Sequence, residues 1–289
     1  MMMVEKVCLI TGGNSGIGKQ AAIQLAQIGF HVIVGVRNLE RGEVALAEIR
    51  EKSGKKDVEL LQIDLSSKKS IIDASNGLKN SHEKLDVLIH NAADFDISRK
   101  RPEKSVDGME SIWATNHIGP VLLTNLLMDL IKKSEQGRII TIASQGLVMH
   151  PKLTVDLDDP EFENRKFSVS SAYYQSKLAQ VMYTYWLAEQ LKDTNITVNG
   201  IRVTNVQVDI SRYPTISRLM KFLYAIKSKF SISPEHMART YTYLASSSDV
   251  SKTTGKYFNE KNKPVSSSAY SMKKENIDAV MELTMKYLN

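Results

Sequence analysis

Short apolar runs rich in Val, Ile and Leu recur along the 289-residue chain, and stretches with helical periodicity separate them. Near-continuous apolar runs are typical of strands that are buried on both faces of a parallel sheet. The runs cover residues 6–11, 31–36, 58–63, 85–90, 138–142 and 196–201, with a seventh strand near 256–258. The helical patterns lie near 17–28, 40–52, 67–80, 106–133 and 171–192. This alternation predicts an α/β fold, in which a doubly wound parallel sheet carries helices on both faces.

Two amphipathic stretches complete the pattern. Between 210 and 232 the apolar residues recur at helical spacing, which predicts a lid near 207–232 over an apolar pocket. Its alternatives are a helix packed permanently on the core and a basic helix that touches a membrane surface. A C-terminal helix near 274–288 has its apolar residues mostly on one side. No repeat or linker interrupts the chain, so we expect a single domain over residues 1–289.

Charge and cysteine content narrow the class of protein. The net charge is +6, but Lys and Arg are spread along the chain without an arginine-rich run or a zinc-finger spacing, so we expect no nucleic-acid partner. The one cysteine, Cys8, lies in an apolar run and is expected to be a buried structural thiol. A single cysteine fits a reducing compartment, and no stretch has the length of a signal peptide or membrane span. We therefore expect a cytoplasmic protein.

A glycine-rich turn joins the first predicted strand to the first predicted helix. Residues 11–18 read Thr-Gly-Gly-Asn-Ser-Gly-Ile-Gly. Glycines let the backbone approach a pyrophosphate closely, and the helix N-terminus supplies free N–H groups and a positive dipole end. The strand before and the helix after favour a dinucleotide-binding turn over an ordinary tight turn, and hence a Rossmann-type sheet. The expected phosphate contacts are Gly12, Asn14, Ser15, Gly16, Ile17 and Gly18.

The end of the second predicted strand indicates which dinucleotide binds. An NAD enzyme usually has an acidic residue here that binds the ribose 2′-hydroxyl, but this chain has Arg37 followed by Asn38. A guanidinium suits a 2′-phosphate by charge and by bidentate geometry, and Lys19 could add charge. The alternative is a surface arginine that starts a loop. We therefore expect NADP(H) rather than NAD(H), with Arg37 and Asn38 among its contacts.

Further short motifs lie at the ends of the predicted elements. They are Asp64-Leu65, His90-Asn91-Ala92-Ala93, Asn116-His117-Ile118-Gly119-Pro120, Ala143-Ser144, Tyr173-x-x-x-Lys177 and Gly255-Lys256-Tyr257-Phe258. In this order, and with the glycine turn, they resemble the short-chain dehydrogenase/reductase family and its retinol-dehydrogenase-like branch over nearly the whole chain. The resemblance implies that Asp64 and Leu65 lie against the adenine and that Asn91, Ala92 and Ala93 belong to the cofactor site. It also implies subunits paired into a homodimer or homotetramer.

The Tyr-x-x-x-Lys motif indicates acid–base chemistry. Tyr173 and Lys177 are four residues apart on one predicted helix, and so on one face. A nearby ammonium favours phenolate and lowers a tyrosine pKa from about 10, toward the range where proton transfer is efficient. The spacing selects Tyr173 over its neighbour Tyr174, whose i+4 residue is Leu178. The alternative is a pair on the helix surface.

Two more residues complete the expected catalytic set. Ser144 follows the fifth predicted strand, at the carboxyl edge of the sheet where such folds bind ligands, and its hydroxyl can hold a substrate oxygen. The resemblance adds that Lys177 bonds the nicotinamide ribose and that Asn116 holds a backbone distortion and a proton-relaying water. The predicted reaction is hydride transfer between nicotinamide C4 and the carbonyl carbon of an apolar aldehyde, ketone or alcohol, with Tyr173 exchanging the proton.

Some positions depart from the family pattern. The usual Pro-Gly after the sixth strand is replaced by Val203-Thr204, and Val208 stands where a Thr grips the nicotinamide carboxamide. These changes support a second hypothesis, a catalytically silent NADP(H)-binding sensor or scaffold. A third is reduction of a ring double bond, as in the related protochlorophyllide reductases. The acidic stretch with Asp156, Asp158, Asp159, Glu161 and Glu163 has no metal-ligand spacing; it is expected to be a solvated loop, and we expect no metal site.

Overall fold

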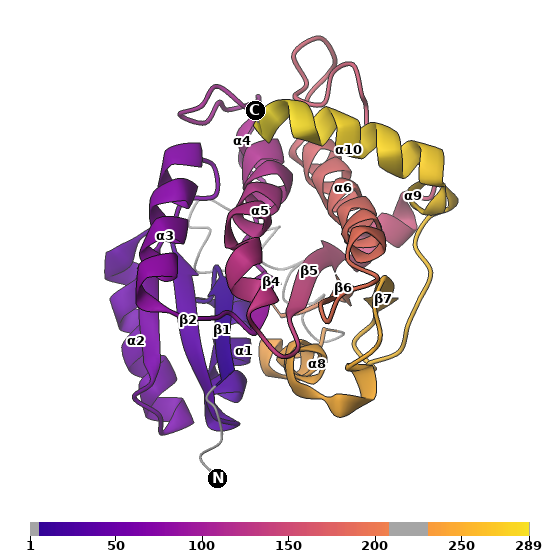
Figure 1. Cartoon of the computed structure of the whole chain (residues 1–289). Helices are drawn as coiled ribbons and strands as arrows, with labels where there is room; N and C mark the ends of the chain where they lie inside the picture. Colours follow the sequence, from indigo (N-terminus) through magenta and orange to yellow (C-terminus); the bar gives the residue numbers. More distant parts are fainter. Residues whose placement is uncertain (1–5, 208–230, 289) are drawn as a thin grey trace.

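A computed structural model describes residues 6–207 and 231–288, and within them the chain builds one seven-stranded parallel sheet (Figure 1). Its strands are β1 (Lys6–Thr11), β2 (Phe30–Val36), β3 (Val58–Gln62), β4 (Val87–His90), β5 (Arg138–Ser144), β6 (Thr197–Val203) and β7 (Lys256–Phe258). Their order across the sheet is β3-β2-β1-β4-β5-β6-β7, and every neighbouring pair is parallel. The doubly wound sheet predicted from the apolar runs is confirmed.

The two faces of the sheet bury separate apolar cores. Within β1, Leu9 packs toward α3 (Lys68–Ser81), α5 (Gly119–Lys132), α6 (Val169–Gln190) and α10 (Lys274–Leu288). Cys8 and Ile10 pack on the other face, with α1 (Gly16–Gln27), α2 (Leu39–Ser53) and α8 (Pro234–Ser246). Side chains alternate between faces along a strand, so an interior strand covered on both sides must be apolar throughout. Cys8 is fully buried, as expected, and burial raises the pKa of its thiol.

The helix predicted near 106–133 is wrong in its first part. Residues 106–109 form a turn instead of a helix. In this turn Gly108 has a φ of +78°, and the Ser105 N–H donates to the Met109 carbonyl. Helix α4 (Ser111–Trp113) then begins, with the Glu110 carboxylate capping the Trp113 N–H at 2.8 Å. A π-helical turn, η1 (Ala114–Ile118), separates it from α5. Apolar periodicity could not reveal this, because one widened turn leaves most of the buried stripe in place.

The prediction missed helix α8. Its start signals are ordinary ones: Ser233 caps the His236 N–H, and Pro234 occupies the first turn. The missed helix directly follows the predicted lid, most of which (208–230) lies outside the described residues. At the two ends of the predicted lid, the Ile232 N–H donates to the Asn205 carbonyl and the Gln207 N–H donates to the Ile232 carbonyl, both at 3.0 Å. Among the described residues, no helix combines the length and the apolar character needed to cross a membrane.

Three further short elements connect the larger ones within the described residues. They are η2 (Gln145–Met149), η4 (Ser248–Val250) and α9 (Ala269–Met272). The acidic stretch before α6 is more tightly held than the predicted solvated loop. The Asp159 carboxylate accepts the backbone N–H groups of Glu163, Asn164 and Arg165, which lowers its pKa. Glu161 accepts from Lys104 and from the Glu110 N–H.

Candidate active site

A cleft of about 1110 Å³ opens at the carboxyl ends of the strands. Parallel α/β sheets bind ligands at this edge, because the loops after the strands converge there. Most of the sequence-predicted site residues line it: Gly12, Asn14, Ser15, Gly16, Ile17, Gly18, Arg37, Asn38, Asp64, Leu65, Asn91, Ala92, Ala93, Ser144 and Tyr173. An inner recess of about 190 Å³ adds Lys177 to Ser144 and Tyr173. The structure therefore brings the predicted nucleotide residues and three of the four predicted catalytic residues to one place.

The glycine turn owes its shape to close backbone packing. Gly12 has a φ of +65°, and a Cβ there would lie 2.9 Å from the Cα of Ala92. A Cβ on Gly18 would lie 2.4 Å from Asn91 Nδ2 and 2.7 Å from the Gly12 carbonyl oxygen. Ser15, at the N-cap of α1, makes no side-chain capping bond, and the first turn of α1 has no acidic residue. This helix N-terminus is therefore suited to an anionic group such as a nucleotide phosphate.

Asn91 lines the cleft, but its amide holds the turn. Its Nδ2 donates to the carbonyls of Thr11 and Gly12 at 2.9 and 3.1 Å. Its Oδ1 accepts the Tyr241 hydroxyl at 3.2 Å, from helix α8. Tyr241 is a site residue that sequence reasoning missed, because a lone tyrosine 150 positions away carries no signal that it will reach the turn.

The other end of the cleft is basic. Arg37 follows β2 and is exposed, while the Asn38 side chain caps α2 by accepting the Arg41 N–H at 2.8 Å. Arg41 also lines the cleft and was missed, although its place four residues after Arg37 is visible in the sequence. Lys19 lines the cleft too, but it forms an ion pair with Glu48, which lowers the pKa of that carboxyl. Among the described residues that line the cleft, Arg37 and Arg41 are thus two cations that a phosphate could meet, beside the paired Lys19.

Asp64 and Leu65 meet the cleft on the side of α5. The Asp64 carboxylate accepts the N–H and hydroxyl of Ser66, at 2.9 and 2.7 Å, which fixes the turn after β3. Gly119, at the start of α5, allows a close approach: a Cβ there would lie 2.1 Å from the Leu65 carbonyl oxygen. Gly119 is a positioning residue whose only signal in the sequence is its place in the motif that begins at Asn116.

Tyr173 and Lys177 lie on the face of α6 that meets the sheet edge. Lys177 Nζ is 5.8 Å from the Tyr173 ring centroid and donates to the Ile142 carbonyl at 2.9 Å. The lysine is only 2% exposed, and burial lowers its pKa to about 8. The Ser144 hydroxyl, at the end of β5, accepts the Gly146 N–H at 3.1 Å. The Tyr173 ring packs on Phe95 with centroids 4.3 Å apart, a contact that no sequence motif predicted.

Asn116 sits behind the cleft and does not line it. It lies in the π-helical turn, 1% exposed. Its Oδ1 accepts the Asp94 N–H at 2.6 Å, and its Nδ2 donates to the Asp94 carbonyl at 3.0 Å and to Ser176 Oγ at 3.1 Å. Arg99 binds the Asp94 carboxylate at 2.9 Å. Asn116 therefore positions the loop after β4 against the helix of Tyr173, and its relay role stays a prediction.

A neutral histidine lies close to the lysine. His90 ends β4, and its Nε2 is 2.7 Å from Thr124 Oγ1. Burial, reinforced by the charge of Lys177, lowers the pKa of His90 to about 3. The histidine is therefore uncharged at neutral pH and adds no second cation to the recess.

The family model for short chain dehydrogenases matches residues 6–155. The chain is also 34% identical over 259 residues to Retinol dehydrogenase 13 from Homo sapiens, covering 88% of this chain and 76% of the relative. This protein belongs to the short-chain dehydrogenase family. Retinol dehydrogenase 14 from Homo sapiens is 34% identical over 273 residues, covering 90% of this chain and 79% of the relative. This short-chain dehydrogenase therefore falls in the retinol-dehydrogenase-like branch, as its motifs indicated.

Solved structures share the fold. An uncharacterized protein from Mycobacterium paratuberculosis superposes with a TM-score of 0.74 at 25% identity, covering 99% of this short-chain dehydrogenase and 94% of that chain. A short chain dehydrogenase from Shigella flexneri complexed with NADP gives a TM-score of 0.69 at 21% identity, covering 90% and 98%. The chain thus shares its overall fold with these solved structures.

Proposed function

We propose that this short-chain dehydrogenase transfers a hydride between NADP(H) and an apolar aldehyde, ketone or alcohol, with Tyr173 as the general acid and base. The observation that carries the proposal is the inner recess, where Tyr173, Lys177 and Ser144 meet at the end of a cleft that begins at the glycine turn. A reducing compartment such as the cytoplasm is the setting we propose, because the one cysteine is free and buried.

The residues present fit a dinucleotide. The glycines of the turn leave room that a side chain would fill, and the α1 N-terminus faces the same cleft. Arg37 and Arg41 supply charge at the other end, and we assign them to the 2′-phosphate of NADP(H). No acidic residue stands at the end of β2 to favour NAD(H). The bound nicotinamide would supply or accept the hydride.

The side chains divide the remaining work. In the reduction, Tyr173 Oη gives its proton to the substrate oxygen, and in the oxidation it takes that proton back. The Lys177 ammonium, on the same helix face, favours the phenolate form while it is charged. The Ser144 hydroxyl holds the substrate oxygen beside Tyr173. Asn116 acts at a distance, by fixing the Asp94 backbone that forms one wall.

The test is the oxidation of NADPH and of NADH, followed by absorbance, with a panel of apolar aldehydes and ketones. All-trans-retinal joins the panel because the relatives are retinol dehydrogenases. We expect turnover with NADPH, a collapse of at least about 100-fold in Tyr173→Phe, and retained turnover in Tyr174→Phe. Tyr174 is the matched control, since it loses the same hydroxyl from the same helix but lacks a lysine at i+4. Equal turnover of the two phenylalanine variants would refute the assignment of Tyr173.

A silent NADP(H)-binding sensor or scaffold is the second candidate. Val203 and Thr204 line the recess in place of the family's Pro-Gly, and Val208 lies outside the described residues. NADPH binding measured by fluorescence, without reduction of any panel member by the wild type, would favour this candidate. A panel member with a conjugated double bond, analysed by its products, separates carbonyl reduction from the double-bond reduction considered above.

A further inference from the structure

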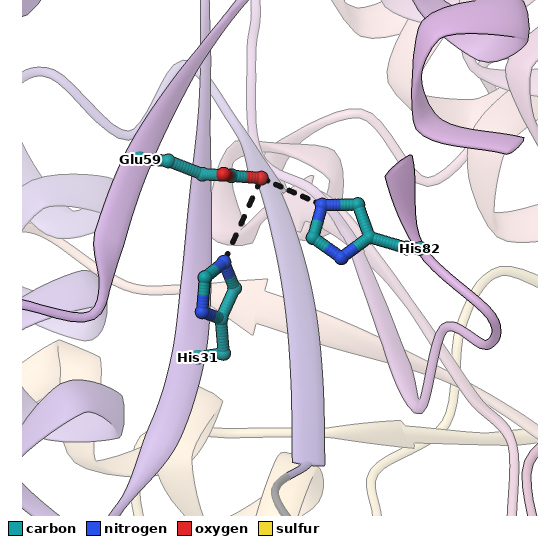
Figure 2. Close-up of side chains that lie close together, drawn as sticks. All are labelled: His31, Glu59 and His82. Carbon is teal, nitrogen blue, oxygen red and sulfur yellow. Dashed lines mark hydrogen bonds and ion pairs between the residues drawn. The ribbon is translucent and has the colours of Figure 1, made fainter. Parts of the chain in front are cut away.

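A cluster of two histidines and one glutamate lies at the opposite end of the sheet from the cleft. His31 is the second residue of β2, Glu59 is the second residue of β3, and His82 is the C-cap of α3. None of the three lines the cleft. Figure 2 shows both imidazole rings pointing toward the same carboxylate from different elements.

The register of the sheet explains why these residues meet. Ile33 pairs with Glu59 across β2 and β3, and His31 lies two positions from Ile33 on the same face. His31 and Glu59 are therefore diagonal neighbours, close enough for long side chains to interact. Helix α3 covers this face, so the residue at its C-terminal end, His82, lies beside His31 and Glu59. A short sequence motif could not have predicted this site, because its three residues lie far apart in the sequence and meet only in the fold.

The geometry leaves a place for a cation. Both Nε2 atoms approach Glu59 Oε1, that of His82 at 2.7 Å and that of His31 at 3.6 Å. The His31 Nε2 atom is shielded from water and has no hydrogen-bond partner among the described residues. A buried ring nitrogen without a partner is costly, and a cation between the rings and the carboxylate would accept its lone pair.

We propose that His31, Glu59 and His82 form a zinc site. Two imidazoles and a carboxylate are a donor set that Zn²⁺ favours, with water in the fourth position, whereas Mg²⁺ and Ca²⁺ prefer oxygen ligands alone. The three ligand atoms lie within 4.8 Å of one another. Tetrahedral zinc spaces its ligand atoms about 3.4 Å apart. The 3.6 Å between His31 Nε2 and Glu59 Oε1 already fits this spacing, whereas the 2.7 Å between His82 Nε2 and Glu59 Oε1 must widen as the ion replaces that contact. The three side chains are 22%, 42% and 14% exposed, which leaves them room to rotate and lets the ion enter.

The consequence of such a site is a cross-link. The ion would join two neighbouring strands and the end of the helix that covers them, at an edge of the sheet where β3 has a neighbour on one side only. An ion that binds the folded chain but not the unfolded one stabilises the fold in proportion to its affinity. Zinc would thus act on stability, apart from the chemistry in the cleft.

The test is a titration of the full chain, purified without a histidine tag, with zinc chloride against a competing chromophoric chelator. We expect one Zn²⁺ per chain, and at least about tenfold weaker binding in each of His31→Ala, Glu59→Gln and His82→Ala, since even the loss of an outer-shell partner weakens metal sites this much. His236→Ala is the matched control, because His236 is exposed on α8 and lies outside the cluster. Magnesium chloride should not compete.

Two further readouts keep the result interpretable. The near-ultraviolet circular dichroism of each variant in zinc-free buffer shows whether it is folded. Cobalt chloride should give the visible absorption of a tetrahedral site in the wild type and in His236→Ala, but not in the three cluster variants. Absence of zinc binding in the wild type, or equal binding in folded cluster variants and in His236→Ala, would overturn the proposal. The cluster would then be an ion pair between Glu59 and the histidines.

Discussion

At the scale of single residues, the shape of the site depends on glycines, because they have no Cβ and so allow neighbouring segments to pack closely. Gly12, Gly18 and Gly119 each lie where a Cβ would come within 3.0 Å of the backbone or side chain of another element. Close packing there lets Asn91 bond the turn and lets α5 approach the strand ends. The reactive side chains are then placed by ordinary hydrogen bonds, such as that from Lys177 to the Ile142 carbonyl.

Gly18→Ala is expected to damage both stability and cofactor binding. The new Cβ would meet the Asn91 amide and the Gly12 carbonyl, so the turn must shift, at a cost of about 1–3 kcal/mol in the free energy of unfolding. Urea denaturation and NADPH fluorescence titration measure the two effects. Gly77→Ala is the control: it is a helical position with nothing within 4 Å, and alanine there should stabilise by about 0.5–1 kcal/mol. Similar unfolding energies in the two variants would contradict the packing argument.

At the scale of elements, the sequence predicted strands well and irregular turns poorly. Interior strands must be apolar on both sides, so their runs are visible without knowing their neighbours. The π-helical turn and the clamp of Asn116 on Asp94 depend on contacts between segments, and apolar periodicity carries no trace of them. The motif residues of the cleft were predicted from the glycine turn, from the Tyr-x-x-x-Lys spacing and from the resemblance to the family, and most of them line the cleft because the fold places strand ends together. Phe95 and Tyr241 were missed because their roles arise only from three-dimensional proximity, whereas Arg41 was missed although its place four residues after Arg37 is visible in the sequence.

The C-terminal helix supports the irregular turn through one buried bond. His117, in the π-helical turn, lies 2.7 Å through its Nε2 from Thr284 Oγ1 of α10. Thr284→Val keeps the shape but leaves that ring nitrogen without a partner, so the free energy of unfolding should fall by about 1–3 kcal/mol. Thr284→Ser retains the hydroxyl and should lose less. Chemical denaturation of the wild type and the two variants measures the free energy of unfolding of each. A Thr284→Val variant as stable as the wild type would show that the bond does not stabilise the turn.

At the scale of the whole molecule, two apolar cores on opposite faces of one sheet hold several buried polar groups in place. His90 and His117 are both fully enclosed, and burial lowers the pKa of each to about 3. The unfolded chain binds a proton at each near an ordinary pKa of about 6.5, and the folded chain does not. Their contribution to stability is therefore complete above that pH and is lost as the pH falls toward 3.

Acid should consequently weaken the fold well before the carboxylates titrate. Between pH 6 and 5, each of the two histidines lowers the free energy of unfolding by about 1.2 kcal/mol. His117→Gln should remove about half of the histidine part of this slope, whereas His236→Gln, at an exposed position, should leave it unchanged. Denaturant titrations from pH 7 to 5 provide the slopes. An undiminished slope in His117→Gln would mean that burial does not lower the pKa of this histidine in the native protein.

The bond from Tyr241 to Asn91 has a consequence for synthesis on the ribosome. The glycine turn, β1 and α1 are made first, yet α8, which packs on α1 and reaches the turn, comes from the last fifth of the chain. Until it emerges, the apolar residues of α1 that face α8 have no cover, and nascent chains with such faces are the species that chaperones bind. The nucleotide pocket is therefore complete only late in translation, although nearly all of the motif residues that line it lie in the first hundred residues.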